Sequence, residues 1–446
     1  LFGFAAGMPI LLIFSSLSLW LREAGIERST VTMFSWAALG YSFKFVWAPL
    51  IDSVPLPWLT AGLGRRRAWI LLAQLMIIAA IAGMALVNPA DSGELTLMAL
   101  AAVLLGFSSA THDIVIDAYR IEIADTDMQP MLAATYSAGY RIGMVVAGAG
   151  ALYLATFFGA VEGSYNYLAW RHTYLVMAAC MSVGVLTTLL VAEPAVNARL
   201  DGQPAARHAR MLALFAAAVL VFVLVFWQLG RLLPSTGVLL AFVAQLLRLA
   251  LALAAAGLAG LLLVRAGLVD RHSAFATWVE PVLDFFARYG RQALWLLALI
   301  GLYRISDIVA GVISNVFYQD MGFSKNEIAT AVKLFGVIMT IAGGLVGGVL
   351  AQRFALKPVM LLGALLACAT NLLFVLLALR GDDLTFLYLA VAVDNLAAGL
   401  ASAAFIAFLS ALTSVRFTAV QYAIFSSLMT LLPKVLGGYS GAMVDH

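Results

Sequence analysis

Residues 359–379 read VMLLGALLACATNLLFVLLAL and contain no charged side chain. A helix that crosses the hydrocarbon core of a bilayer needs roughly 20 such residues, so this segment predicts a transmembrane helix. Strands of a membrane barrel would be about half as long and would alternate apolar with polar residues, a pattern that this segment lacks.

The rest of the chain repeats this pattern. Of its 446 residues, 63% are hydrophobic and 11% are charged, whereas a soluble domain has about 25% charged residues. The composition therefore excludes a soluble globular protein and predicts an all-α, polytopic membrane protein. We expect thirteen spans, at residues 1–21, 30–52, 68–88, 95–118, 131–158, 171–192, 211–230, 237–265, 292–318, 327–352, 357–379, 384–412 and 419–444.

Lysine and arginine are concentrated in the loops on one side of these spans. That side includes the run Arg65 to Arg67, Arg265, Arg353 and Lys357. The positive-inside rule makes it the cytoplasmic side, and long apolar helices are typical of a protein of the inner-membrane type. The net charge of +3 is small, and we expect no nucleic-acid partner.

The spans fall into two groups, which are separated by a pair of spans with few polar residues. We expect a six-helix bundle at residues 1–193, an inserted helix pair at 194–270, a cytoplasmic amphipathic helix at 271–291, and a second bundle at 292–446 whose last helix is absent. The sequence thus predicts two six-helix halves with a helix pair inserted between them. In the second half, Gly343 and Gly347 are four residues apart, which predicts close helix packing.

Ionisable residues occur within many of the apolar spans. Such a side chain costs a few kcal/mol or more at bilayer depth, so it is retained where it lines a cavity or meets a partner. The set comprises Lys44, His112, Asp113, Asp117, Arg141, Arg304, Asp307, Lys333, Asp394 and Lys434.

Asp113 and Asp117 are four residues apart and so share one helix face. Two carboxylates at low dielectric suit a group that takes up and releases a proton. For Asp117 an alternative stays open, because it could simply pair with an arginine near the helix end. His112 is interpreted as a hydrogen-bonded neighbour.

Arg304 and Asp307 are three residues apart on another helix. They could form a local salt bridge that only makes the helix insertable. The polar residues that follow, including Asn315, favour instead a solvated stripe along this helix.

The buried cations come from five helices, and their positive charge favours an anionic substrate. Tyr140 lies beside Arg141 and could stack on a sugar ring, and Gln421 adds a polar group to the last span. The sequence contains no GxSxG, HExxH, P-loop or GxGxxG motif, and its histidines lack metal-ligand spacing. We therefore expect no enzyme activity, no metal and no cofactor, and transport driven by a gradient.

Several strings of residues resemble one transporter family. The link after the second span, with Asp52 and then Gly64, Arg65, Arg66 and Arg67, resembles a lengthened form of the cytoplasmic loop signature of the major facilitator superfamily. Five strings resemble the AmpG-type muropeptide permeases over nearly the full chain: WAPLID (47–52), LGRRRAW (63–69), DIVIDAYR (113–120), YRISD (303–307) and FTAVQYA (417–423).

The resemblance implies proton-driven import of anionic sugar-peptides, the anhydromuropeptides, into the cytoplasm by a monomeric carrier in the lipid bilayer. In cell-wall recycling this uptake is linked to β-lactamase induction. We assign proton coupling to Asp113, Asp117, Asp307 and Asp394, and substrate binding to Lys44, Tyr140, Arg141, Arg304, Asn315, Lys333, Gln421 and Lys434. Two alternatives remain: a carrier of another large anion such as acetyl-CoA, and a membrane-embedded enzyme.

Overall fold

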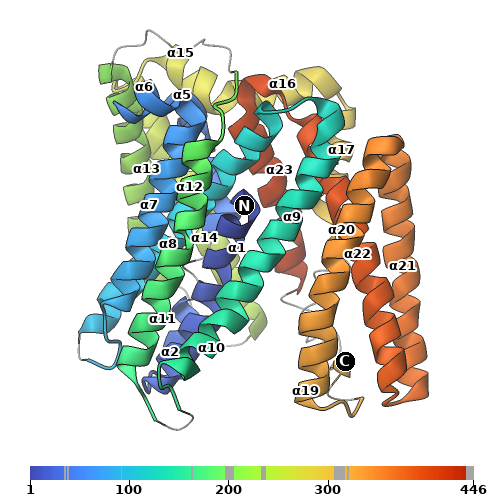
Figure 1. Ribbon diagram of the computed structural model, residues 1–446. Helices are drawn as coiled ribbons and strands as arrows, with labels where there is room; N and C mark the ends of the chain where they lie inside the picture. The colour runs from blue at the N-terminus through green and yellow to red at the C-terminus, as the bar shows by residue number, and fades with distance from the viewer. Residues whose placement is uncertain are drawn as a thin grey trace. The chain divides into compact units, whose positions relative to one another are not determined.

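A computed structural model describes residues 1–34, 37, 40–91, 93–161, 164–195, 205–232, 238–305, 317–318 and 321–437. These residues are almost entirely helical (Figure 1). No strand occurs among them, and an isolated bridge joins Val161 to Ser164. The expected all-α class is therefore confirmed.

Ten helical segments in the described parts of the chain are long and apolar enough to cross a membrane. They are Phe2–Glu23, Arg65–Ala85, Glu94–Glu122, Thr126–Phe157, Tyr167–Leu190, Arg207–Leu232, Leu247–Arg265, Ala329–Arg353, Leu356–Arg380 and Leu384–Leu412. Each coincides with one of the spans expected from the sequence.

The three other expected spans are not among these ten segments. The one at 30–52 is divided into α3 (Arg28–Phe34), α4 (Gly40–Phe43), a 3-10 turn (Lys44–Val46) and α5 (Ala48–Ser53). Pro49 stands in the first turn of α5, and because proline has no backbone N–H, a new helix begins there more readily than an old one continues. The spans expected at 292–318 and 419–444 extend beyond the described residues.

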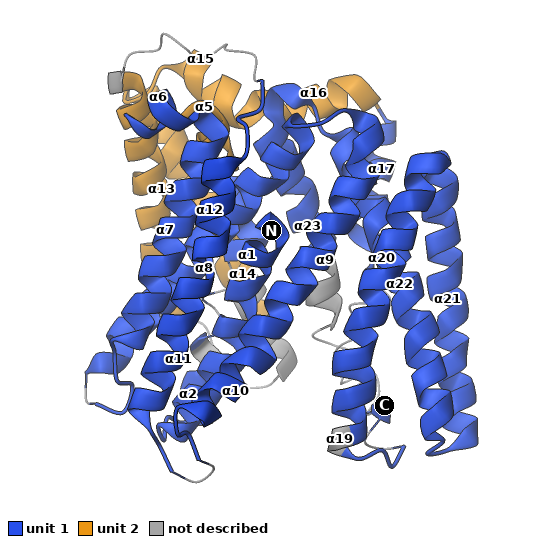
Figure 2. Cartoon of the chain, in the orientation of Figure 1, with its two compact units in different colours: residues 1–46, 56–195, 291–446 blue, residues 47–55, 196–290 orange. Residues whose placement is uncertain are grey.

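The chain forms two compact units (Figure 2). The first consists of residues 1–46, 56–195 and 291–446 and therefore contains parts of both expected bundles. Its N-terminal helices are α1 (Phe2–Leu11), α2 (Leu17–Glu23), α3, α4, α6 (Leu59–Leu63), α7 (Arg65–Ala85), α8 (Glu94–Glu122), α9 (Gln129–Val145), α10 (Ala151–Phe157), α11 (Tyr167–Cys180) and α12 (Ser182–Leu190). Its C-terminal helices are α17 (Gln292–Leu302), α19 (Lys325–Ile328), α20 (Gly336–Arg353), α21 (Leu356–Arg380), α22 (Leu384–Leu412) and α23 (Thr418–Gly437).

The second unit consists of residues 47–55 and 196–290. It contains α5, α13 (Ala205–Leu232), α14 (Val238–Arg265), α15 (Arg271–Ala274) and α16 (Glu280–Tyr289). Arg248 of α14 ties the long pair together: its Nε donates to the Phe226 carbonyl at 2.6 Å, and its guanidinium lies 3.7 Å from the centre of the Phe226 ring.

Glycines allow several helices of the first unit to approach closely. A Cβ added at Gly7 of α1 would overlap the Tyr140 backbone of α9, and one at Gly343 of α20 would overlap the Leu396 backbone of α22. A Cβ added at Gly348 of α20 would lie 2.7 Å from the Ala134 side chain of α9, so α20 and α9 touch across the two halves. Small residues let helix backbones pack this tightly in a membrane.

Candidate functional site

The two carboxylates of α8 lie in its most deeply buried stretch. Asp113 is 8% exposed and Asp117 is 6% exposed, and the neighbouring residues of the helix are also buried. Their spacing of four residues places both on one face. The site is therefore built on a rigid helix and not on a loop.

Asp117 lies between two cations. Its Oδ2 is 3.8 Å from Nζ of Lys44, which belongs to the 3-10 turn Lys44–Val46, and its Oδ1 is 3.6 Å from a guanidinium nitrogen of Arg120. Both distances exceed the roughly 2.7–2.9 Å of a charge-assisted hydrogen bond. The carboxylate is thus held by charge attraction to both cations, and the pairing with a nearby arginine is present.

Asp113 has a different environment. Its Oδ1 accepts no hydrogen bond within the described residues. It lies within electrostatic range of Lys44, Asp117, Tyr41 and Tyr140. A buried carboxylate oxygen that lacks a donor is costly when it is ionised, because nothing replaces its lost hydration.

A polar chain supports the helix behind Asp113. The Thr188 hydroxyl lies 2.9 Å from Oε1 of Gln74, and Nε2 of Gln74 lies 3.1 Å from Nε2 of His112. His112 is fully buried. This agrees with its interpretation as a hydrogen-bonded neighbour and not as an exposed proton carrier.

Arg120 connects the carboxylates to the second half of the chain. A guanidinium nitrogen donates to the Ser410 hydroxyl of α22 at 3.0 Å, and the group lies 5.4 Å from the centre of the Tyr422 ring of α23. Gln129 holds it from the other side: Oε1 accepts from Arg120 at 3.3 Å, while Nε2 donates to carbonyls at the end of α8.

Two further cations from different halves lie within electrostatic range of each other. Arg141 belongs to α9, and Arg304 lies just after α17. Neither is fully buried, and no carboxylate of the described residues pairs with Arg141. Like charges repel one another, so an anion between them would be favourable.

Other predicted site residues lie elsewhere. Asp394 of α22 accepts a hydrogen bond from Thr370 at 2.8 Å, and Lys333 is exposed in the π-helical turn Ala329–Phe335. Gln421 is 1% exposed, and its amide oxygen accepts from the Ser414 N–H at 2.8 Å. Gln421 therefore braces the start of α23, and its role as a substrate contact stays a prediction. The remaining residues, Asp307, Asn315 and the side chain of Lys434, lie outside the described residues.

The basic loop signature holds the start of α7. The Glu193 carboxylate accepts from the backbone N–H groups of Arg66 and Arg67 at 2.7 and 3.0 Å, which caps that helix. The Arg66 guanidinium pairs with Glu122 at the end of α8. Gly64 has φ of 88° and leaves room for Glu193, which a Cβ would strike. Arg65, the first residue of α7, is half-buried. Asp52 belongs to the second compact unit.

Sequence reasoning missed the neutral partners Gln74, Thr188, Gln129 and Ser410, and also the carboxylates Glu122 and Glu193. Of these residues, only Gln74 could have been noticed in the sequence, because it places an amide within an apolar span. The others lie at helix ends, where polar residues are ordinary.

Comparison with known proteins gives consistent relatives. The sequence model of the Major Facilitator Superfamily matches residues 1–303. The anhydromuropeptide permease of Escherichia coli K12 is 30% identical over 445 residues, which is 99% of this chain and 73% of that protein. Putative transporter AmpG 4 of Rickettsia conorii is 28% identical over 443 residues, 99% of this chain and 88% of that one.

Among solved structures, the proton:xylose symporter XylE bound to 6-bromo-6-deoxy-D-glucose aligns with a TM-score of 0.58 at 14% identity, covering 100% of this chain and 86% of that chain. A double tryptophan mutant of XylE aligns with a TM-score of 0.56 at 12% identity, covering 99% and 87%. At these identities the likeness concerns the fold alone.

Proposed function

The chain belongs to the major facilitator superfamily and, within it, to the AmpG-type permeases, and we propose that it imports anhydromuropeptides into the cytoplasm together with protons. It is a multi-pass membrane protein whose relatives are transporters. The name of the Escherichia coli relative supports the substrate class, and the excess of basic residues in one set of loops supports an inner-membrane location.

The observation that carries the proposal is the placement of the α8 carboxylates. Among the residues that the structure describes, none donates to Oδ1 of Asp113, whereas Asp117 faces both Lys44 and Arg120. Such unequal environments favour different protonation behaviour in the two groups. We assign proton uptake to Asp113, because nearby Lys44 can then pair fully with Asp117.

The cations Arg141 and Arg304 provide the second part of the mechanism. They come from both halves and lie within electrostatic range of each other. A substrate that has peptide carboxylates would bridge them and draw the halves together, as alternating access requires. Tyr140, next to Arg141 on α9, provides an aromatic face for a sugar ring.

The test is uptake of labelled anhydromuropeptide into liposomes that contain the purified full chain, with and without an imposed pH gradient. We expect accumulation only when the outside is more acidic. Uptake that ignores the gradient would refute the proton coupling, and absence of uptake by folded protein would refute the substrate.

A carrier of another large anion is the second candidate, because the paired cations Arg141 and Arg304 would also attract acetyl-CoA. Labelled acetyl-CoA in the same liposomes separates the two. Accumulation of acetyl-CoA but not of anhydromuropeptide would favour this second candidate.

A further inference from the structure

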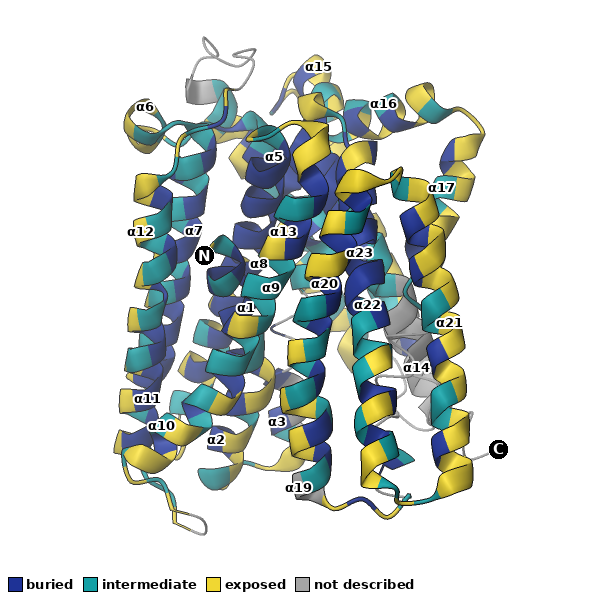
Figure 3. Cartoon of the chain, turned by 45° about the vertical axis from the view of Figure 1, so that its right-hand side comes forward, coloured by how far each residue is buried: buried dark blue, intermediate teal, exposed yellow. Residues whose placement is uncertain are grey.

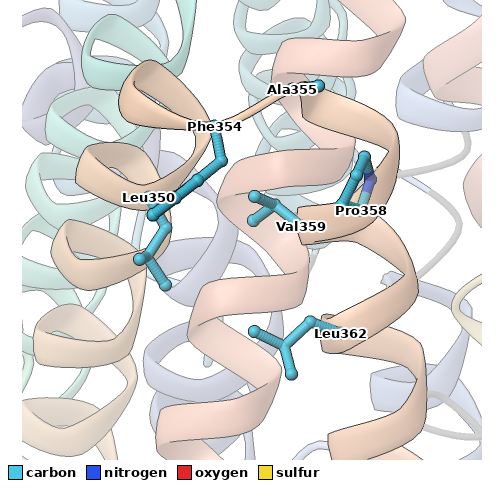
Figure 4. Close-up of a pocket in the computed structure, with 6 residues that line it drawn as sticks. All are labelled: Leu350, Phe354, Ala355, Pro358, Val359 and Leu362. Atoms are coloured by element: carbon cyan, nitrogen blue, oxygen red, sulfur yellow. The ribbon is translucent and has the colours of Figure 1, made fainter.

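The link between α20 and α21 contains an apolar slot (Figure 4). Leu350 and Phe354 line one side, and Ala355, Pro358, Val359 and Leu362 line the other, around about 260 Å³. No lining residue has a polar side chain. Because pockets for drug-sized ligands measure roughly 300–1,000 Å³ and contain some polar groups, this slot does not suit a sugar-peptide.

Two basic residues are sequence neighbours of residues that line the slot. Arg353 ends α20, and Lys357 lies in the first turn of α21, which contains no acidic residue. Both side chains are exposed, and neither forms an ion pair with any described residue. By contrast, Arg380 at the far end of α21 pairs with Asp383 at 3.6 Å and lies over the Phe386 ring.

The position in the bilayer makes this combination informative. Helices α20 and α21 both span the membrane, so their short link lies at its surface, and exposed residues extend along α21 (Figure 3). The distribution of basic loops assigns the link to the cytoplasmic side. Basic side chains there meet lipid headgroups, and the slot below them meets acyl chains.

We propose that this slot binds one anionic phospholipid of the cytoplasmic leaflet. Its phosphate pairs with Arg353 and Lys357, and one acyl chain lies along Leu350, Val359 and Leu362. Basic pockets beside transmembrane helices recognise anionic headgroups in this way. A neutral lipid would leave both cations uncompensated, and a free anion would leave the apolar slot unused.

Native mass spectrometry of the full chain tests the proposal. The detergent-purified protein is titrated with dioleoyl phosphatidylglycerol or dioleoyl phosphatidylcholine, and retained lipid is counted. We expect phosphatidylglycerol to be retained preferentially, and the double variant R353Q/K357Q to lose that preference by on the order of tenfold. Arg380→Gln, which removes the same charge at the other end of α21, should bind like the wild type.

A second variant tests the slot separately from the charges. Ala355→Trp keeps both cations but fills the space for the chain, so it should also bind less phosphatidylglycerol. Equal retention of the two lipids by the wild type, undiminished binding in R353Q/K357Q, or undiminished binding in Ala355→Trp would each overturn the proposal. Displacement of the lipid by millimolar inorganic phosphate would assign the site to a soluble anion and would overturn it too. Thermal melting shows that each variant is folded, and Lys357→Gln alone replaces the double variant if that one is not.

Discussion

Asp113 and Asp117 are one helical turn apart but have different partners. Asp117 has Lys44 and Arg120 at 3.8 and 3.6 Å, whereas Oδ1 of Asp113 has no donor among the described residues. The charged form of Asp117 is therefore compensated locally. The charged form of Asp113 depends on Lys44, which it shares with Asp117.

Asp113→Asn should abolish the response of uptake to a pH gradient, because the amide cannot take up or release a proton. The protein should remain folded, since the neutral amide resembles the protonated acid. Uptake into liposomes measures the first effect and thermal melting the second. Asp91→Asn, in an exposed loop, is the control, and a gradient response that survives in Asp113→Asn removes Asp113 from the coupling.

Arg141→Gln should weaken substrate binding while leaving proton coupling in place. A hydrogen bond to a charged group contributes about 1.5–3 kcal/mol, so the KM for uptake should rise roughly 10- to 100-fold. Arg380→Gln removes a cation that already pairs with Asp383, and its KM should not change. An unchanged KM in Arg141→Gln would make Arg141 a structural residue.

At this scale the sequence predicts charged residues better than their neutral partners. Lys44, Asp113 and Asp117 are noticeable because a charge in an apolar span is expensive, and the structure brings these three together. Ser410 is 290 positions from Arg120, and serines are common in spans. No periodicity links two such positions, so their contact needs the tertiary structure.

Several helices approach closely at positions where glycine replaces a larger side chain. The spacing of Gly343 and Gly347 predicts close packing, and both face α22 at positions where a Cβ would meet the backbone of Leu396 or Leu400. The span boundaries follow hydropathy within a few residues, as in Leu384–Leu412. The division of the span at 30–52 is harder to predict, because many membrane helices continue through a proline such as Pro49.

Gly343→Val should separate α20 from α22 and destabilise the protein by about 1–3 kcal/mol, as overpacking does. Lower thermal stability in detergent is the measurement. Gly257→Val in α14 is a matched control, because a Cβ there meets nothing within 4 Å. Equal melting of the two variants would show that α20 and α22 can adjust without cost.

The two halves of the first unit meet where the carboxylate site ends. Arg120 contacts Asp117 in its own helix and Ser410 in α22, and Gly348 packs on Ala134 across the same boundary. One guanidinium thus belongs both to the charged cluster and to the contact between halves. We propose that a change in the pairing of Asp117 reaches α22 and α23 through Arg120.

Ser410 variants test this link in both directions. Ser410→Ala removes a hydrogen bond to a charged group, which should shift the equilibrium toward separated halves by about 1.5–3 kcal/mol. Ser410→Asp instead gives Arg120 a carboxylate partner. It should therefore hold the halves together and slow uptake. The separation of the halves is measured at Met131→Cys, which lies beside Gly348, in a protein whose Cys180 and Cys368 are replaced by serine. A membrane-impermeant thiol reagent is applied from the cytoplasmic side, and its rate of reaction with the introduced cysteine is recorded. The reference is the same Met131→Cys protein with Ser410 unchanged. Compared with it, labelling should be faster in Ser410→Ala and slower in Ser410→Asp. If both variants label at one rate, Arg120 and Ser410 do not control the contact between the halves, and the coupling has to pass through other residues of α8.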